Sequence, residues 1–172
     1  MPTSRVYLAG PDVFLPDAVA QGERKKQICR AHGLDGRYPL DVAALPPGLA
    51  PRAQARALFD AMIGLMDSCD AGIANLTPFR GPSMDVGTAV EIGYLHARGK
   101  RVFGYTNDPR DYARRVSADG LLIEEFGLCD NLMIEGVIAR VVRAAAPPEN
   151  VLGALDSFER CVREAAAELL VR

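Results

Sequence analysis

The stretch SMDVGTAVEIGY, residues 83–94, carries one carboxylate, Glu91, inside an otherwise apolar run that has the pattern of a helix. An ionised side chain is costly to bury unless it is paired, hydrogen-bonded or needed for chemistry. Side chains in a helix lean toward its N-terminus, and the residues three and four positions earlier, Thr88 and Gly87, are small enough to leave a pocket above Glu91. We therefore interpret Glu91 as a reactive carboxylate rather than as a solvated residue on an outer helix face.

A second carboxylate, Asp85, lies six residues before Glu91 at the junction of a loop and the helix. There it can act as an N-cap or as a first-turn acid that complements the helix dipole. Beside Glu91 at a crevice, it could also accept hydrogen bonds from a sugar hydroxyl. Two acids at one site are typical of glycosidic chemistry, in which one carboxylate attacks the anomeric carbon. Spacing alone does not decide between these roles.

The first apolar run, RVYLAGP at residues 5–11, offers further candidates. Tyr7 is either an ordinary core aromatic or a phenol that holds the nucleophilic carboxylate in place. Phe14, in the loop after Gly10, is either a loop anchor or a stacking surface for a base. The run lacks the GxGxxG of dinucleotide sites, and no GxxxxGK[ST] occurs in the chain, which argues against cofactor-dependent redox chemistry and phosphoryl transfer.

Composition excludes several classes of partner. With 172 residues, a net charge of −2 and no basic block, the chain is expected to form one domain, 1–172, that does not bind nucleic acid. It has no apolar run near the roughly 18 residues of a membrane helix and no signal-peptide pattern, so we expect no membrane partner and a cytoplasmic location. Its four scattered cysteines and two histidines show no metal-ligand spacing, so no metal is expected.

Apolar runs alternate with longer amphipathic ones along the chain. Strands are expected at RVYLAGP, AGIANL (71–76) and RVFGYT (101–106), with weaker candidates at RYPLD (37–41), where Pro39 suggests an edge, and LLIEEF (121–126). Helices are expected at about 17–32, 51–68, 132–145 and 151–171 and in the Glu91 segment to near Gly99, with a loop at ALPPGLAPR (44–52).

This alternation predicts an α/β fold, with a parallel sheet covered by helices on both faces. Ligands of such sheets bind outside the C-terminal ends of the strands. We therefore expect three loops to share that edge: AGPDVF (9–14), TPFRGPSMD (77–85) and TNDPRDY (106–112).

Three segments together resemble the nucleoside 2-deoxyribosyltransferase family: VYLAGPDVF, DAGIANLTPFRGPSMDVGTAVEIGYLHARGKRVFGY and CDNLMIE. They cover roughly residues 5–140 in the family's order, and the most specific piece is D-x-G-T-A-x-E-x-G from Asp85 to Gly93. The resemblance implies a flavodoxin-like sheet and transfer of 2-deoxyribose from one nucleobase to another without a cofactor. A deoxynucleoside and a free base would be the small-molecule partners.

The resemblance also implies roles for single residues. Glu91 falls on the family's nucleophile, Asp85 on the residue that binds a sugar hydroxyl, and Tyr7 on the tyrosine that orients the nucleophile. Asn131 matches an asparagine that reaches the site of a neighbouring subunit, with Met133 at the shared wall, which implies a homo-oligomer.

One role of the family does not map onto a single residue. The base-handling aspartate falls on the helix before DAGIANL, where Asp60 is preferred to Asp67 because it lies deeper in the helix. The loop after Gly10 differs in detail among relatives, so the sequence does not indicate a preference for purine or pyrimidine.

The mechanism implied is a double displacement. Glu91 attacks C1′ of the deoxynucleoside, the departing base takes up a proton, and an incoming base attacks the glycosyl ester from the opposite side, so that the β-configuration is retained. Water that intercepts the ester would give slow hydrolysis.

Two other functions remain open on the sequence. A 2′-deoxynucleoside 5′-monophosphate N-glycosidase would need phosphate donors where Asp85 stands, and an ionised Asp85 would repel a dianion at short range. Ser83, Arg80 and Gly81 lie close by and could supply such donors. A nucleotide-sensing module that binds without turnover is the third function.

Overall fold

The computed structural model describes residues 3–42 and 45–170, and the strands in these residues form one parallel sheet. The strands are β1 (Arg5–Ala9), β2 (Asp35–Arg37), β3 (Ala71–Asn75), β4 (Arg101–Thr106) and β5 (Arg140–Arg143). Their order is β2-β1-β3-β4-β5, and each neighbouring pair is parallel. This order is that of flavodoxin-like sheets, which confirms the fold class predicted from the sequence.

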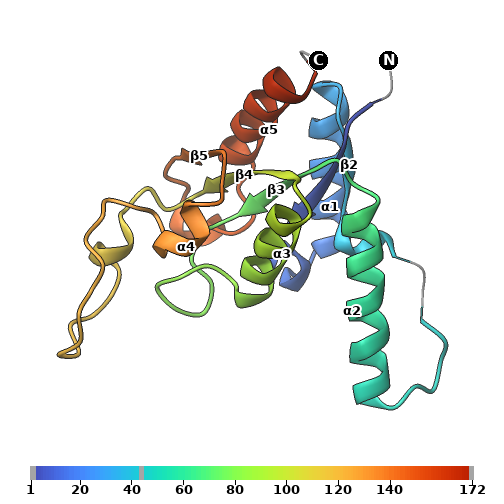
Figure 1. The fold of residues 1–172 in the computed structure, drawn as a ribbon, viewed down its shortest axis with the longest axis horizontal. Helices are drawn as coiled ribbons and strands as arrows, with labels where there is room; N and C mark the ends of the chain where they lie inside the picture. The colour runs from blue at the N-terminus through green and yellow to red at the C-terminus, as the bar shows by residue number, and fades with distance from the viewer. Residues whose placement is uncertain (1–2, 43–44, 171–172) are drawn as a thin grey trace.

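Helices cover both faces of the sheet (Figure 1). They are α1 (Ala18–Ala31), α2 (Pro51–Asp67), α3 (Val86–Ala97), α4 (Leu132–Glu135) and α5 (Asp156–Leu169), with 3₁₀ turns at η1 (Pro11–Phe14), η2 (Pro39–Asp41), η3 (Tyr112–Arg114) and η4 (Pro148–Asn150). The helices α1 and α5 pack on one face, and α3, α4 and the C-terminal end of α2 pack on the other. Much of α2 extends beyond the sheet in Figure 1.

The central strands are buried on both faces, because each face carries a helical layer. In β1, Val6 and Leu8 belong to the cluster beneath α1 and α5, whereas Tyr7 and Ala9 belong to the cluster beneath α3. Alternation along β1 therefore directs Tyr7 toward the helix that carries Glu91. None of the helices in the described ranges is both long and apolar enough to cross a membrane.

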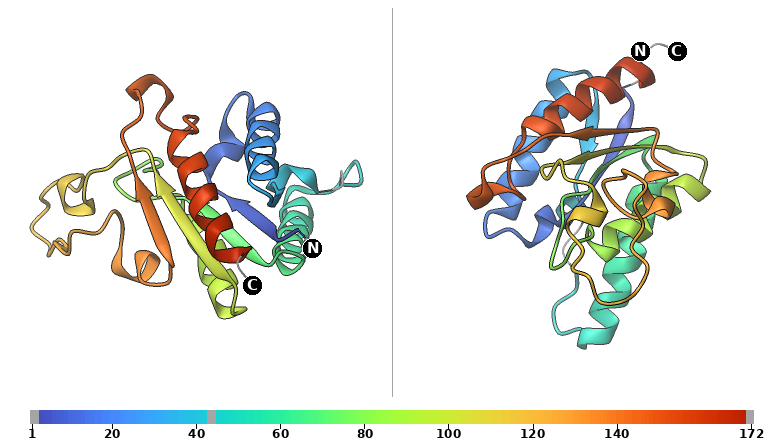
Figure 2. Two further views of the ribbon diagram at one scale, coloured as in Figure 1. Left: turned by 90° about the horizontal axis from the view of Figure 1, so that it is seen from above. Right: turned by 90° about the vertical axis from the view of Figure 1, so that its left-hand side faces the viewer.

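Two of the predicted strands were wrong. The strand expected at 37–41 lies earlier, as β2, because Pro39 cannot donate to a ladder and instead begins the turn η2. The segment 121–126 forms no strand. It belongs to a loop that Figure 2 shows projecting from the body, where no strand is available to pair with it.

The helix expected at 132–145 was also wrong. It ends at Glu135, where Gly136 follows as the C-cap, and the chain then enters β5, whose Val141 and Val142 favour a strand paired with β4. The last helix, expected at 151–171, begins only at Asp156, and Val171 lies outside the described residues. Ala44, at the start of the predicted 44–52 loop, lies outside them too.

Candidate active site

The structure brings Tyr7 of β1 and Glu91 of α3 into direct contact. The fully buried Tyr7 hydroxyl donates a hydrogen bond of 2.5 Å to Glu91 Oε1, and it lies 3.6 Å from the sulfur of Met62 on α2. A hydrogen bond to an ionised acceptor is shorter and stronger than a neutral one. The phenol therefore restricts the direction in which the carboxylate points, which is the second of the two roles that the sequence left open for Tyr7.

Burial raises the pKa of Glu91 to about 7. The Tyr7 hydrogen bond works in the opposite direction, because it stabilises the ionised form, and the nearby charge of Asp85 raises the pKa further. Burial and the Glu91 charge raise the pKa of Tyr7 far above its ordinary value, so Tyr7 stays a donor. Near neutral pH the site therefore holds a partly ionised carboxylate in a desolvated setting, which is typical of functional groups.

Asp85 is the N-cap of α3. Its Oδ2 accepts from the Thr88 backbone N at 2.9 Å and from the Thr88 hydroxyl at 3.0 Å. Both bonds use the same oxygen and fix the rotamer of the carboxylate. Thr88 is buried and acts on the site through Asp85, whereas a Cβ at Gly87 would approach Asp85 Oδ2 to 3.0 Å. The capping role of Asp85 is therefore observed, and its role toward a sugar hydroxyl stays a prediction.

The loop after β1 is held by close packing. A Cβ on Gly10 would lie 2.7 Å from the Asn75 Cβ and 2.5 Å from Asp12 Oδ2, so only glycine fits. Phe14 is 58% exposed, and its ring stacks on Phe79 with centroids 5.3 Å apart and planes 10° apart. Phe14 thus anchors its own loop to the loop after β3, and both loops lie at the sheet edge predicted for the site.

Sequence reasoning missed a buried ion pair behind the β1 loop. Lys25 Nζ lies 2.8 Å from Asp12 Oδ2, and both side chains are 1% exposed. Asn75 also donates to this oxygen, and the ammonium lies 5.0 Å from the centre of the Phe158 ring. The helical spacing could have indicated that Lys25 is buried, because Lys25 follows Gln21 by four residues on the stripe of α1 that faces the sheet.

The two aspartates considered for base handling both lie on α2. Asp60 is exposed and accepts from Arg56 at 3.1 Å. Met62, two residues later, contacts Tyr7, and residues two apart point to nearly opposite sides of a helix. Asp67 accepts from Tyr94 and from Arg98, near the far end of α3. The structure does not join either aspartate to Glu91, so the base-handling role of Asp60 stays a prediction.

The remaining predicted residues lie in the loop before α3 and at the start of α4. The Ser83 hydroxyl donates to Asp130 Oδ1 at 2.5 Å. Asn131 is the N-cap of α4: its Oδ1 accepts from the Met133 N at 2.9 Å, and its Nδ2 donates to Glu124. Met133 is exposed. The capping role of Asn131 is therefore observed, and its role toward a neighbouring subunit stays a prediction.

The four cysteines are not part of a metal-ligand cluster in the described part of the chain. Cys29, Cys69, Cys129 and Cys161 are free and buried. Among the described residues, no group of three or more histidine, cysteine, aspartate or glutamate side chains is placed to hold a metal ion.

Known proteins resemble this chain in sequence and fold. An uncharacterised protein of Schizosaccharomyces pombe is 34% identical over 95% of this chain and 89% of its own length. A solved structure titled as a 2-desoxiribosyltransferase from Leishmania mexicana superposes with a TM-score of 0.67, at 30% identity, over 92% of this chain and 97% of that chain. A 2-deoxyribosyltransferase from Bacillus psychrosaccharolyticus shares the fold, with a TM-score of 0.54, at 18% identity, over 91% of this chain and 96% of that chain.

A family profile spans the candidate site. The profile described as Nucleoside 2-deoxyribosyltransferase matches residues 6–133, a span that contains Tyr7, Asp85, Glu91 and Asn131. The match extends over most of the chain, and the bonded Tyr7 and Glu91 both lie within it. On this evidence, the chain belongs to the nucleoside 2-deoxyribosyltransferase family.

Proposed function

We propose that the protein transfers 2-deoxyribose between nucleobases through a covalent glycosyl ester on Glu91. The observation that carries the proposal is the 2.5 Å bond from the buried Tyr7 hydroxyl to Glu91. A nucleophile must be desolvated and aimed, and this pair supplies both features. Family membership supports the same reaction class.

In the first half of the reaction, one oxygen of Glu91 forms a bond to C1′ as the bond from C1′ to the base breaks. The base leaves with the electron pair of that bond and takes up a proton. In the second half, a nitrogen of the incoming base attacks C1′ from the opposite face, and the ester oxygen departs as the Glu91 carboxylate. The incoming base gives up the proton of that nitrogen, which balances the proton that the departing base took up. Two inversions retain the β-configuration.

The charge of Asp85 favours a nucleoside over a nucleotide as substrate. A carboxylate accepts a hydrogen bond from a sugar 5′-hydroxyl, whereas it repels a 5′-phosphate dianion. The Ser83 hydroxyl, one of the donors that a phosphate could use, already donates its proton to Asp130. Both contacts argue against hydrolysis of a 5′-monophosphate as the main activity.

A test of the reaction uses deoxyinosine with adenine as acceptor, followed by deoxyinosine monophosphate without an added base. New deoxyadenosine from the first mixture supports the transferase. Deoxyribose phosphate from the second mixture, without any transfer in the first, would show a nucleotide N-glycosidase instead. Binding without turnover of either compound would show a sensing module, and Glu91→Gln serves as the inactive control in each arm.

We also propose that the protein acts as a homo-oligomer in which Asn131 completes a neighbour's site. Four apolar side chains near this residue are exposed: Leu121, Leu122, Phe126 and Met133. Exposed apolar patches of this kind commonly mark protein interfaces. Mixing Glu91→Ala with Asn131→Ala subunits should then restore activity above the sum of the two variants. Exchanged hetero-oligomers, detected by native mass spectrometry, that regain no activity would refute the shared site.

A further inference from the structure

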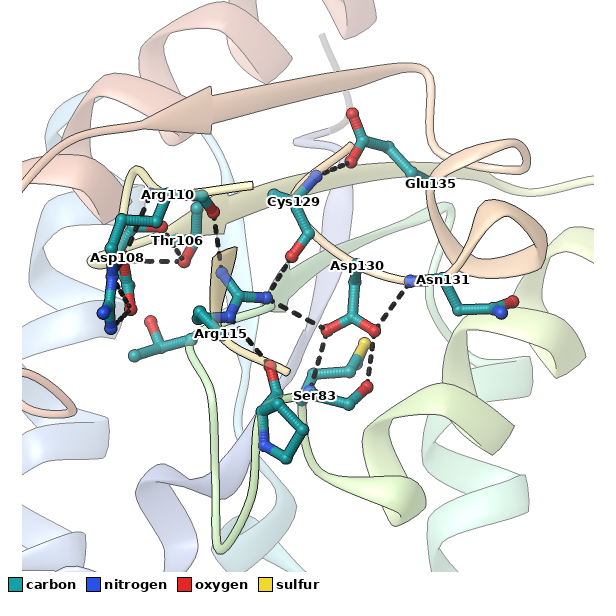
Figure 3. Close-up of polar contacts among 12 residues, drawn as sticks. Ser83, Thr106, Asp108, Arg110, Arg115, Cys129, Asp130, Asn131 and Glu135 are labelled. Carbon is teal, nitrogen blue, oxygen red and sulfur yellow. Dashed lines mark hydrogen bonds and ion pairs between the residues drawn. The ribbon is translucent and has the colours of Figure 1, made fainter. Parts of the chain in front are cut away.

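A buried guanidinium joins three loops next to the start of α3 (Figure 3). Arg115 follows η3, and its side chain is 3% exposed. Its Nε donates to the Pro82 carbonyl at 2.8 Å, its Nη1 to the Arg110 carbonyl at 2.8 Å, and its Nη2 to the Cys129 carbonyl. The planar fork of arginine suits this task, because its N–H groups point in fixed and divergent directions.

Asp130 is the carboxylate that faces this guanidinium. It is fully buried and lies 4.0 Å from Arg115 Nη2. Its Oδ1 accepts from the Ser83 hydroxyl at 2.5 Å and from the Asn131 backbone N at 2.8 Å, and its Oδ2 accepts from the Met84 N at 2.8 Å. Figure 3 shows these bonds converging on the two oxygens of Asp130. The charge is thus paired and supplied with donors, as a buried carboxylate requires.

The segment that these two residues hold leads directly into Asp85. Pro82, Ser83 and Met84 each receive or donate one of the bonds described above, and Asp85 is the next residue. The tip of the same loop is open, since nothing lies within 4 Å of a Cβ placed on Gly81. The bonds from Arg115 and Asp130 therefore fix the last three residues before the N-cap of α3.

We propose that Arg115 and Asp130 are positioning residues that hold Asp85 in place for the sugar 5′-hydroxyl. They act through the backbone of residues 82–84 and do not touch the substrate. The inference rests on the proposed function, in which Asp85 binds that hydroxyl. It adds two residues to the working site that lie about 30 to 45 positions further along the chain than Asp85.

The variant Asp130→Asn tests this role with little change in shape. The asparagine oxygen still accepts from Ser83 and Asn131, but its NH₂ group cannot accept from the Met84 N–H, so one bond to the loop is lost. Arg115→Lys is the second variant, because an ammonium cannot reach three divergent carbonyls. Arg110→Lys is the matched control. The Arg110 side chain, also drawn in Figure 3, pairs with Asp108 at the surface and makes no bond to residues 82–84.

The measurement is the ratio of kcat/KM for 2′-deoxyadenosine to that for 2′,5′-dideoxyadenosine, with a common acceptor base. We expect Asp130→Asn and Arg115→Lys to lower this ratio by roughly tenfold, the usual effect of losing a well-placed hydrogen bond to a charged group. Adding either change to Asp85→Ala should lower the ratio no further, and Arg110→Lys should keep the wild-type ratio. Equal losses on both substrates, with the ratio unchanged, would show a purely structural role and overturn the proposal.

Amide hydrogen exchange tests, without any turnover, whether Asp130 holds residues 82–84 and Asp85 in place. Asp130→Asn should accelerate exchange at the Met84 amide, and also at the Thr88 amide, whose acceptor is Asp85. Unchanged protection at Thr88 would contradict the positioning role. A wild-type protein that turns over neither substrate would refute the proposed function. The exchange result would still show whether Asp130 holds Asp85 in place. If Asp130→Asn does not fold, Ser83→Ala, which removes only the hydroxyl bond to Asp130, is measured in the same two ways.

Discussion

Removal of the Tyr7 hydroxyl should slow the reaction at neutral pH by raising the pKa of Glu91. In the wild type that pKa is raised to about 7, and the Tyr7 hydrogen bond keeps it from rising further. A hydrogen bond to a charged group contributes about 1.5–3 kcal/mol, and one pKa unit corresponds to about 1.4 kcal/mol. Tyr7→Phe should therefore move the ionisation of Glu91 upward by about one to two pH units.

The size of the loss follows from the ionised fraction, because only the carboxylate attacks C1′. At pH 7 about half of the wild-type Glu91 is ionised, and a rise of one to two units leaves about 1–10%. The rate of Tyr7→Phe at pH 7 should thus fall roughly 5- to 50-fold. Most of this loss should return near pH 9, apart from a smaller deficit caused by poorer orientation of the carboxylate.

The assay is kcat/KM for transfer from deoxyinosine to adenine, measured from about pH 5.5 to 9.5. The rising limb of the profile reports Glu91 in the free enzyme. The matched control is Tyr94→Phe, which removes a hydroxyl that donates to Asp67 at 2.9 Å rather than to Glu91. We expect the rising limb of the Tyr94→Phe profile to coincide with that of the wild type. A Tyr7→Phe limb that stays in place, or moves to lower pH, would refute the role assigned to this hydrogen bond.

Substitutions at Glu91, Asp85 and Lys25 give distinct results. Glu91→Ala should abolish transfer and background hydrolysis by at least about a thousandfold, whereas Glu91→Gln should still fold and bind nucleoside; wild-type-like turnover in either would contradict covalent catalysis. Asp85→Ser should weaken nucleoside turnover and improve tolerance of a 5′-phosphate, and an unchanged ratio would leave Asp85 as a cap alone. Lys25→Met should cost about 3–5 kcal/mol in urea unfolding, because it leaves Asp12 buried without its cation. Lys26→Met, at an adjacent lysine paired nearer the surface, should cost clearly less.

The strands that could be predicted from the sequence are those that are buried on both faces. The cores of β1, β3 and β4 are continuous apolar runs, and such runs need no knowledge of the rest of the fold. The edge strand β5 could not be recognised in the same way. Its sequence RVVR also fits a helix turn, and only pairing with β4 decides its conformation. Tertiary context thus overrode local propensity at the edge of the sheet.

The same distinction applies to the site. The contact of Tyr7 with Glu91 was one of the two roles that the sequence left open for Tyr7, and the family resemblance favoured it. The partners of Asp12 and Asp130 could not be predicted from the sequence. Each is neutralised by a cation that comes from a different segment of the chain, and no local pattern marks that cation as its partner. Buried ion pairs of this kind depend on the assembled fold.

Trapping of the glycosyl ester tests the central claim most directly. The wild-type protein is mixed with a 2′-deoxynucleoside without an acceptor base, quenched in acid within the first turnover, and digested for peptide mass spectrometry. We expect a deoxyribosyl adduct on the peptide that contains Glu91, lost on addition of an acceptor base and missing from Glu91→Gln. Steady turnover with no adduct at any quench time, or an adduct on another residue, would contradict the assignment of Glu91 as the nucleophile.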